Sequence, residues 1–242
     1  MASSLFSREM KPPVPATEVA RLEALRQYDI LDTAPEQAFD DVTKLAAFIC
    51  GTPTAIMSLI DRERQWFKAK VGLPASEMPR EQAFCAYTIL QPDLLEVEDA
   101  KKDRRFADNP LVLNSPNIRF YAGQPLITPG GHALGSLCVI DQQPRKLSAE
   151  QKACLESLAR MVMTTLELRR VSSLLAETSA NVKSLSGLLP ICSGCKKIRN
   201  DKGYWNQVEV YISKHTDAEF THGFCPDCSE KYFPGVRPAA PK

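Results

Sequence analysis

The sequence predicts an α+β fold, in which helices flank a largely antiparallel sheet and a long helix leads to a small cysteine-rich module. Three observations predict this class. Short apolar runs occur in pairs that are joined by turn sequences, as in β-hairpins. Segments with apolar residues at helical spacing lie before and after these runs. Four cysteines in two C-x2-C pairs follow near the end of the sequence.

The first part of the sequence predicts a loose arm and two helices. Residues 1–16 are polar and contain three prolines, so we expect a flexible arm. A helix is expected over residues 17–30, where Thr17 can serve as the N-cap. A second helix is expected over residues 35–50, because Pro35 suits its first turn and apolar residues recur there at helical spacing.

The middle of the sequence predicts two hairpins with a helix between them. A polar turn over residues 61–64 joins the first two apolar runs, and a Pro-Gly-Gly turn at 129–131 joins the last two. The intervening helix is expected over residues 79–90. The strands are expected over residues 54–60, 65–71, 94–98, 119–127 and 133–140.

Several motifs in this part of the sequence resemble those of a GAF domain. The motifs are residues 103–106, 109–112, 118–126, 134–141 and 144–147. The resemblance covers roughly residues 17–170, of which residues 17–147 are the expected GAF sensor domain. It implies a six-stranded antiparallel sheet flanked by helices, which signalling proteins use to sense a small ligand or a protein partner. The fold alone names no ligand.

The resemblance implies a small-molecule pocket between the sheet and the layer formed by residues 79–118. The candidate ligand-binding residues are Trp66, Phe67, Cys85, Tyr87, Arg105, Phe106, Arg119 and Tyr121. Arg105 and Arg119 suit an anionic ligand. The alternative is that they pair with Asp103 and Asp99 as ordinary structural charges, and that the aromatic residues are core.

Motifs of the common catalytic classes do not occur in the sequence. It contains no H-E-x-x-H, G-x-S-x-G, P-loop or G-x-G-x-x-G pattern. Residues 148–189 hold no histidine that a histidine kinase would phosphorylate. We therefore expect a protein that is not an enzyme. The rival hypothesis is a redox sensor or redox enzyme that uses cysteines, although Cys85 and Cys138 also read as small buried apolar residues.

A long helix is expected over residues 148–189, because Ser148 can cap its start and neither proline nor glycine occurs over residues 145–186. Seven residues form a seam at alternating spacings of three and four, as in a coiled coil. They are Leu168, Val171, Leu175, Thr178, Val182, Leu185 and Leu189. The seam predicts a homodimer through residues 168–189, and packing back onto the sensor domain is the alternative.

The two C-x2-C pairs predict one structural Zn²⁺ bound by four thiolates. The expected ligands are Cys192, Cys195, Cys225 and Cys228. Zinc is favoured over iron, because Lys196 and Ser229 stand where rubredoxin-like iron sites use glycine. A four-thiolate site leaves no open position for a substrate. The zinc-binding module is expected over residues 190–236, followed by a tail at 237–242. Oxidation of the pairs with loss of metal is an alternative.

This module resembles a small C-terminal module found on bacterial response-regulator-like and GAF-containing proteins. The resemblance lies in residues 188–199, 203–205 and 221–228, and the order of its elements is similar to a treble-clef zinc finger. It implies two-component-type signalling and an unidentified signalling partner. It implies no catalytic activity.

The overall composition argues against nucleic acid and membrane as partners. The net charge is +1, and residues 190–242 hold eight basic and six acidic residues, too weak a positive charge to favour nucleic-acid binding. No apolar run is long enough to span a membrane and no export signal opens the sequence, so we expect a cytoplasmic protein. A zinc-dependent transcriptional regulator is a further alternative function.

Overall fold

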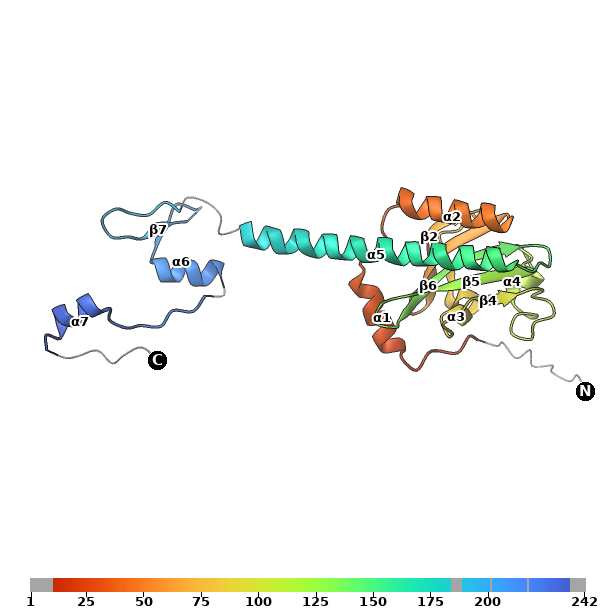
Figure 1. The fold of residues 1–242 in the computed structure, drawn as a ribbon, viewed down its shortest axis with the longest axis horizontal. Helices are drawn as coiled ribbons and strands as arrows, with labels where there is room; N and C mark the ends of the chain where they lie inside the picture. The colour runs from red at the N-terminus through yellow and green to blue at the C-terminus, as the bar shows by residue number, and fades with distance from the viewer. Residues whose placement is uncertain (1–10, 184–188, 201, 217, 236–242) are drawn as a thin grey trace, which may run out of the picture. The chain divides into compact units, whose positions relative to one another are not determined.

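The structure, a computed structural model, describes residues 11–183, 189–200, 202–216 and 218–235, with the backbone alone for residues 179–183 (Figure 1). The first ten residues of the predicted arm and the predicted tail therefore lie outside the described residues.

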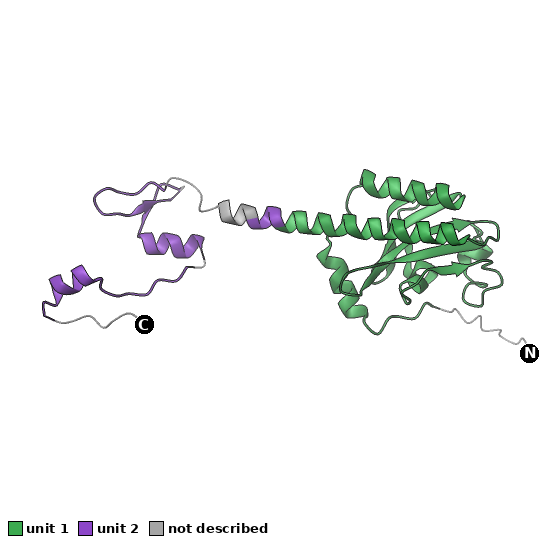
Figure 2. Ribbon diagram, viewed as in Figure 1, with its two compact units in different colours: residues 1–174 green, residues 175–242 purple. Residues whose placement is uncertain are grey.

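The chain divides into two compact units, residues 1–174 and residues 175–242 (Figure 2). Among the described residues, the first unit contains one six-stranded sheet with helices on both faces. The second contains the last residues of a long helix that begins in the first unit, a two-stranded sheet and two short helices. The predicted α+β class is confirmed.

The sheet of the first unit is antiparallel throughout, with strand order β3-β2-β1-β6-β5-β4. This confirms the six-stranded antiparallel sheet that the sequence motifs implied. The strands are β1 (Thr54–Ile60), β2 (Arg64–Val71), β3 (Glu77–Pro79), β4 (Leu95–Val97), β5 (Phe120–Ile127) and β6 (Ala133–Asp141).

Both predicted hairpins are present. The Asp61 N–H donates to the Arg64 carbonyl at 2.9 Å, which closes the turn between β1 and β2. The Thr128 N–H donates to the His132 carbonyl at 3.0 Å, which closes the turn between β5 and β6. Gly131 has φ +81°, a left-handed conformation that favours glycine in this turn.

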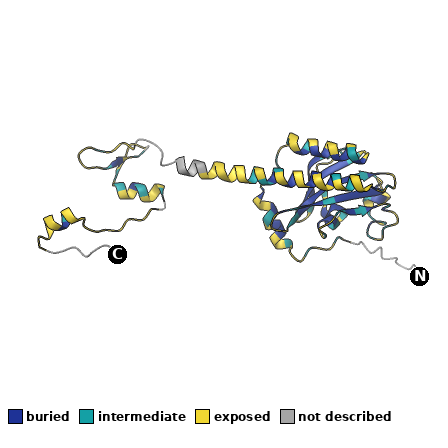
Figure 3. Cartoon of the chain, viewed as in Figure 1, coloured by how far each residue is buried: buried dark blue, intermediate teal, exposed yellow. Residues whose placement is uncertain are grey.

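Each face of the sheet is covered by its own helices and has its own core (Figure 3). One face carries α1 (Glu18–Gln27), α2 (Gln37–Cys50) and α5 (Ala149–Lys183), and we call its apolar cluster the first core. The other face carries the single-turn helices α3 (Cys85–Thr88) and α4 (Pro110–Leu113), and we call its cluster the second core.

The continuous helix predicted over residues 79–90 is wrong. The chain instead forms the end of β3, a 3-10 turn at Arg80–Gln82 and the single turn of α3. Ala83 is extended between the two turns, with φ −77° and ψ 124°. Phe84 then stacks on Phe106 with ring centroids 4.0 Å apart, so tertiary packing overrides the local apolar spacing.

The start of α5 confirms the predicted cap. The Gln151 N–H donates to Ser148 Oγ at 3.2 Å, and the Ser148 N–H donates to Gln151 Oε1 at 3.0 Å. This reciprocal arrangement is a capping box, which satisfies two backbone donors at a helix N-terminus.

The second unit contains β7 (Ile198–Arg199), β8 (Trp205–Asn206), α6 (Val208–His215) and α7 (Pro226–Tyr232). Trp205 lies in β8, and α6 begins at Val208. Among the described residues, no helix is long and apolar enough to cross a membrane.

Candidate functional site

A pair of thiols lies at the centre of the second core. Cys85 opens α3 and Cys138 lies in the middle of β6, so one thiol comes from the helix layer and the other from the sheet. Their Sγ atoms are 3.7 Å apart. Both side chains are shielded from solvent, with Cys138 at 0% exposure.

Polar groups converge on the Cys85 thiol from neighbouring elements. Gln65 Nε2 donates to Cys85 Sγ at 2.9 Å and also to Ser58 Oγ at 2.8 Å. The Tyr121 hydroxyl donates to Cys85 Sγ at 3.4 Å and lies 2.5 Å from Thr88 Oγ1. All of these side chains are buried, so the thiol lies in a polar cluster inside an apolar core.

These contacts set the charge distribution of the cluster. Burial raises the pKa of Cys85, but the neighbouring Cys138 thiol and the nearby hydroxyl groups of Ser136 and Ser58 outweigh burial and lower it. The hydrogen bond to Cys85, together with burial, raises the pKa of Cys138. Burial raises the pKa of Tyr121. The cluster therefore favours a thiolate on Cys85 and protons on Cys138 and Tyr121.

Aromatic side chains fill the space that the sequence assigned to a ligand. Phe106 stacks on Phe84, and Tyr87 meets Phe106 edge-on with ring centroids 4.9 Å apart. Phe67 and Tyr121 join the same core. The structure therefore brings Phe67, Cys85, Tyr87, Phe106 and Tyr121 together, mainly by packing against one another.

Trp66 does not belong to this group. It packs in the first core, where its ring lies 6.0 Å from Lys68 Nζ. Successive residues of a strand point to opposite faces, so Trp66 and Phe67 of β2 cannot both face the same pocket.

The two candidate arginines form ion pairs at the rim. Arg119 Nε and Nη2 each lie 2.9 Å from an oxygen of Asp99. Arg105 Nη2 lies 2.6 Å from Asp103 Oδ2, and its guanidinium lies 5.1 Å from the Phe106 ring centroid. The pairing lowers the pKa of both aspartates. Both arginines therefore make the aspartate ion pairs that the alternative interpretation of these residues expected.

An open groove lies beside these ion pairs. Its volume is about 790 Å³ and its walls come from β4, the loop after it and the segment before α5. Arg119 is the only candidate ligand residue among its lining residues. The groove carries basic and acidic side chains in equal number, so it has no net charge to attract an anion.

The sequence did not point to the polar partners of Cys85. Ser58 and Ser136 are register partners on β1 and β6, and Gln65 and Thr88 complete the shell. Ser136 Oγ is buried without a hydrogen-bond partner among the described residues. The feature of the sequence that could have pointed to these partners is a single serine inside each of the two largely apolar strands β1 and β6.

The cysteines of the second unit come together in pairs. The Cys195 N–H donates to Cys192 Sγ at 3.5 Å, and the Lys196 N–H donates to the Cys192 carbonyl at 2.9 Å. Lys196 has φ +62°, so a lysine adopts the left-handed conformation for which knuckles often use glycine. The turn is thus a cysteine knuckle despite its sequence.

The second pair lies at the start of α7, with Cys225 preceding Pro226. Backbone N–H groups lower the pKa of Cys192, chiefly from Cys195, and of Cys225, chiefly from Cys228. Thiolates are the form that zinc binds, so the donor chemistry fits zinc. The described residues do not gather three or more potential metal ligands at one point, because the two pairs stay separate.

Comparison with known proteins identifies the first unit. The GAF domain family profile matches residues 34–166, more than half of the chain. A cyclic di-GMP phosphodiesterase of Pseudomonas aeruginosa is 43% identical over 167 residues, which cover 69% of this chain and 28% of that enzyme. The chain therefore spans 28% of the length of this curated relative.

Solved structures of GAF domains are similar to this chain. The GAF domain of a phosphoenolpyruvate-protein phosphotransferase from Coxiella burnetii is 16% identical, with a TM-score of 0.49, and the match covers 64% of this chain and 98% of that one. The corresponding domain from Acinetobacter is 17% identical, with a TM-score of 0.47 and coverage of 65% and 96%. By the family match over residues 34–166, the chain belongs to the GAF domain family.

Proposed function

We propose that this GAF-domain signalling protein is a cytoplasmic, non-enzymatic sensor whose domain core controls α5. The input would be a small molecule or a protein partner, and α5 would join two protomers. The output would be a zinc-stabilised module that binds a signalling partner. The observation that carries the proposal is a connector, residues 28–36, which contacts both β2 and α5.

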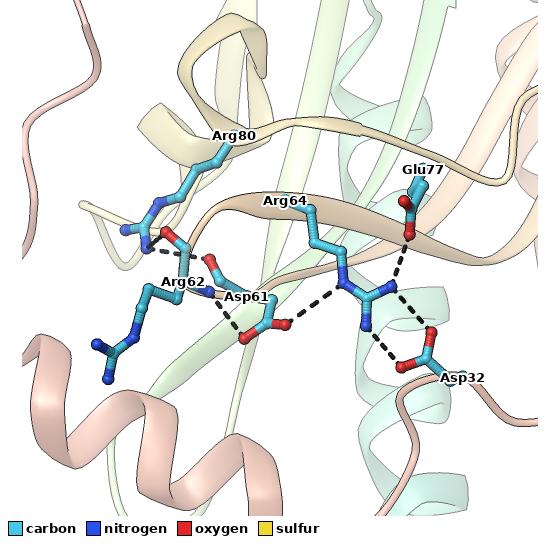
Figure 4. A network of polar contacts seen from close by, with 6 residues as sticks. All are labelled: Asp32, Asp61, Arg62, Arg64, Glu77 and Arg80. Carbon is cyan, nitrogen blue, oxygen red and sulfur yellow. Dashed lines mark hydrogen bonds and ion pairs between the residues drawn. The ribbon is translucent and has the colours of Figure 1, made fainter.

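The sheet holds the connector through two cations of β2. Arg64 lies among three carboxylates, and its Nη2 lies 2.6 Å from Asp32 Oδ2 in the connector (Figure 4). The Lys68 side chain is 0% exposed, and its Nζ donates to Thr33 Oγ1, to the Ala34 carbonyl and to Glu36 Oε1, all within 2.8 Å.

The helix α5 holds the same connector from the other side. Arg169 Nη1 donates to the Asp29 carbonyl at 2.8 Å, and its Nε lies 3.5 Å from Glu36 Oε1. The Tyr28 hydroxyl donates to Glu167 Oε1. Burial and then this hydrogen bond raise the pKa of Tyr28, so the hydroxyl keeps its proton.

One carboxylate oxygen therefore serves both the sheet and the helix. Glu36 Oε1 accepts from Lys68 of β2 and lies in ion-pair range of Arg169 of α5. A movement of β2 away from α5 would strain these two contacts. The connector is thus a physical route by which a change in the sheet alters the end of α5 that leaves the first unit.

The proposed dimer rests on apolar residues that α5 exposes. Leu168 and Leu175 are 67% and 64% exposed and lie seven residues apart on one helix face, with Val171 between them. Leu185 of the seam lies outside the described residues. Light scattering at micromolar concentration is expected to give a dimeric mass. Replacing Leu168 and Leu175 by glutamate should give a monomer, whereas Ser173→Glu, off the seam, should leave the dimer intact.

The cysteine thiolates of the second unit are the reason why the proposed function includes a zinc module. Two cysteine pairs, in each of which one thiol has a lowered pKa (Cys192 and Cys225), suit Zn²⁺, which would fix the ends of the module and need no substrate position. The phosphodiesterase activity in the name of the Pseudomonas aeruginosa relative is not carried over, because the match spans only 28% of that protein.

Loosening the sheet side of the connector tests the proposed transmission. The variant Arg64→Gln loses the ion pair with Asp32 and is expected to speed amide hydrogen exchange in residues 164–174 of α5 by about threefold. Arg62→Gln is the matched control, since the Arg62 side chain points away from the network in Figure 4. Faster exchange in the connector with unchanged exchange in α5 would contradict the proposal.

A further inference from the structure

We propose that Cys85 and Cys138 are a dithiol that a small hydroperoxide oxidises to a disulfide, so that the core of the GAF domain responds to peroxide. This names the chemical class of the input and rests on the proposed sensor function. The Sγ atoms are already 3.7 Å apart, so a modest side-chain movement brings them to bonding distance.

The surroundings of Cys85 are built for a thiolate. A neutral thiol sulfur is a weak acceptor, yet the Gln65 amide and the Tyr121 hydroxyl both donate to it, and Cys138 lies within hydrogen-bond distance. Ser136 adds a buried hydroxyl with no hydrogen-bond partner among the described residues. Such a shell lowers the cost of ionising a buried sulfur, and the thiolate is the form that attacks a peroxide.

The proposed reaction balances with hydroperoxide as the oxidant. The Cys85 thiolate attacks one peroxide oxygen, the O–O bond breaks, and the leaving oxygen takes up a proton to give an alcohol or water. Cys85 is then a sulfenic acid. The Cys138 sulfur attacks it and forms the S–S bond. The sulfenic hydroxyl leaves with the Cys138 proton as water. Two thiols lose two electrons, and the hydroperoxide gains two.

A second cysteine pair in the same unit provides an internal comparison. Burial, and then the neighbouring Cys154, raise the pKa of Cys50 to about 11. Cys50 therefore stays a neutral thiol at physiological pH, and we expect it to resist oxidation. Burial raises the pKa of Cys50, whereas Cys85, which is likewise buried, also has donors on its sulfur, so we expect the two thiols to differ in reactivity.

Oxidation of Cys85 and Cys138 would also affect the contacts of the connector. A disulfide removes the thiolate acceptor of Gln65 and Tyr121, which must then find other partners. Gln65 lies in β2 between Arg64 and Lys68, the two cations that hold the connector. The thiol cluster and the route to α5 therefore share one strand.

The test uses the full-length reduced protein exposed to hydrogen peroxide. Remaining thiols are alkylated after denaturation, and unreduced tryptic peptides are analysed by mass spectrometry. Trypsin places Cys50, Cys85, Cys138 and Cys154 on four separate peptides, so each pairing is identified directly. We expect two peptides cross-linked through Cys85 and Cys138. We expect Cys50 to stay a free thiol during oxidation and therefore to be alkylated afterwards. Complete alkylation of Cys85 and Cys138 after exposure, or Cys85 paired elsewhere, would overturn the proposal.

Two variants separate the chemistry from a folding defect. Cys138→Ser should accumulate a sulfenic acid on Cys85 that dimedone traps. Gln65→Leu should slow oxidation about tenfold at neutral pH and move the pH midpoint of the rate upward, because it loses one donor to the thiolate. An unchanged pH midpoint in a folded Gln65→Leu protein would also overturn the proposal. The hydrogen-exchange test of Arg64→Gln uses reduced protein. It can therefore support the proposed transmission to α5 even if the peroxide experiment shows no disulfide.

Discussion

Treatment with a metal chelator is expected to unfold residues 190–236, the proposed zinc module, and to leave the GAF domain folded. The second unit buries little: within residues 190–235, the described buried side chains are Ile198, Tyr211 and Ser229. Its sheet has only two residues in each strand. A core of this size cannot offset the entropy of ordering the segment, so metal binding would supply most of the folding free energy.

Limited proteolysis with mass spectrometry, before and after chelation, measures this effect. Cleavage is expected within residues 190–236 only after chelation, and metal analysis should give one zinc per chain. Cys195→Ser should behave like the chelated protein. Cys154→Ser, which changes a thiol of the first unit, is the matched control. Protease resistance of the module after complete metal removal would refute the structural role of zinc.

Glu36→Ala is expected to lower the free energy of unfolding of the first unit by about 2 to 3 kcal/mol, whereas Lys68→Met should change it by less than about 1 kcal/mol. The asymmetry follows from burial. Glu36 is 38% exposed, so it tolerates the loss of its partner, but the Lys68 side chain is 0% exposed. Removing Glu36 leaves a buried ammonium with neutral acceptors only.

Urea unfolding followed by circular dichroism measures both values. Methionine matches the length of the lysine stem, and Phe39 and Trp66 beside Lys68 Nζ supply an apolar surround for it. A Lys68→Met protein that is destabilised as much as Glu36→Ala would show that the ion pair itself, and not the cost of an unpaired buried charge, governs this site.

The sequence was sufficient for those elements whose signal is local. Both hairpins follow from short apolar runs that flank turn residues, and the cap at Ser148 follows from its spacing to Gln151. The helix over residues 79–90 failed, because Phe84 packs against Phe106, which lies far along the chain. Apolar spacing alone cannot anticipate such a contact.

The candidate site could likewise be predicted only in part from the sequence. Cys85 and Tyr121 could be named from the sequence as candidates, but their convergence with Gln65 and Ser58 depends on strand register and on the position of α3. Trp66 illustrates the limit, since a one-residue difference along β2 decides between two faces. Register is a property of the assembled sheet, and a single strand does not encode it.

The most direct test of the central claim, that β2 and α5 are coupled through Glu36, is a double-mutant cycle of Lys68→Met and Arg169→Met. Both cations approach Glu36 Oε1, and they repel each other. Each single variant relieves that repulsion and leaves the other cation on Glu36, whereas the double variant leaves Glu36 with neither cation. The double variant is therefore expected to lose at least about 0.5 kcal/mol more stability than the sum of the single changes. Changes that add within about 0.3 kcal/mol would contradict the claim.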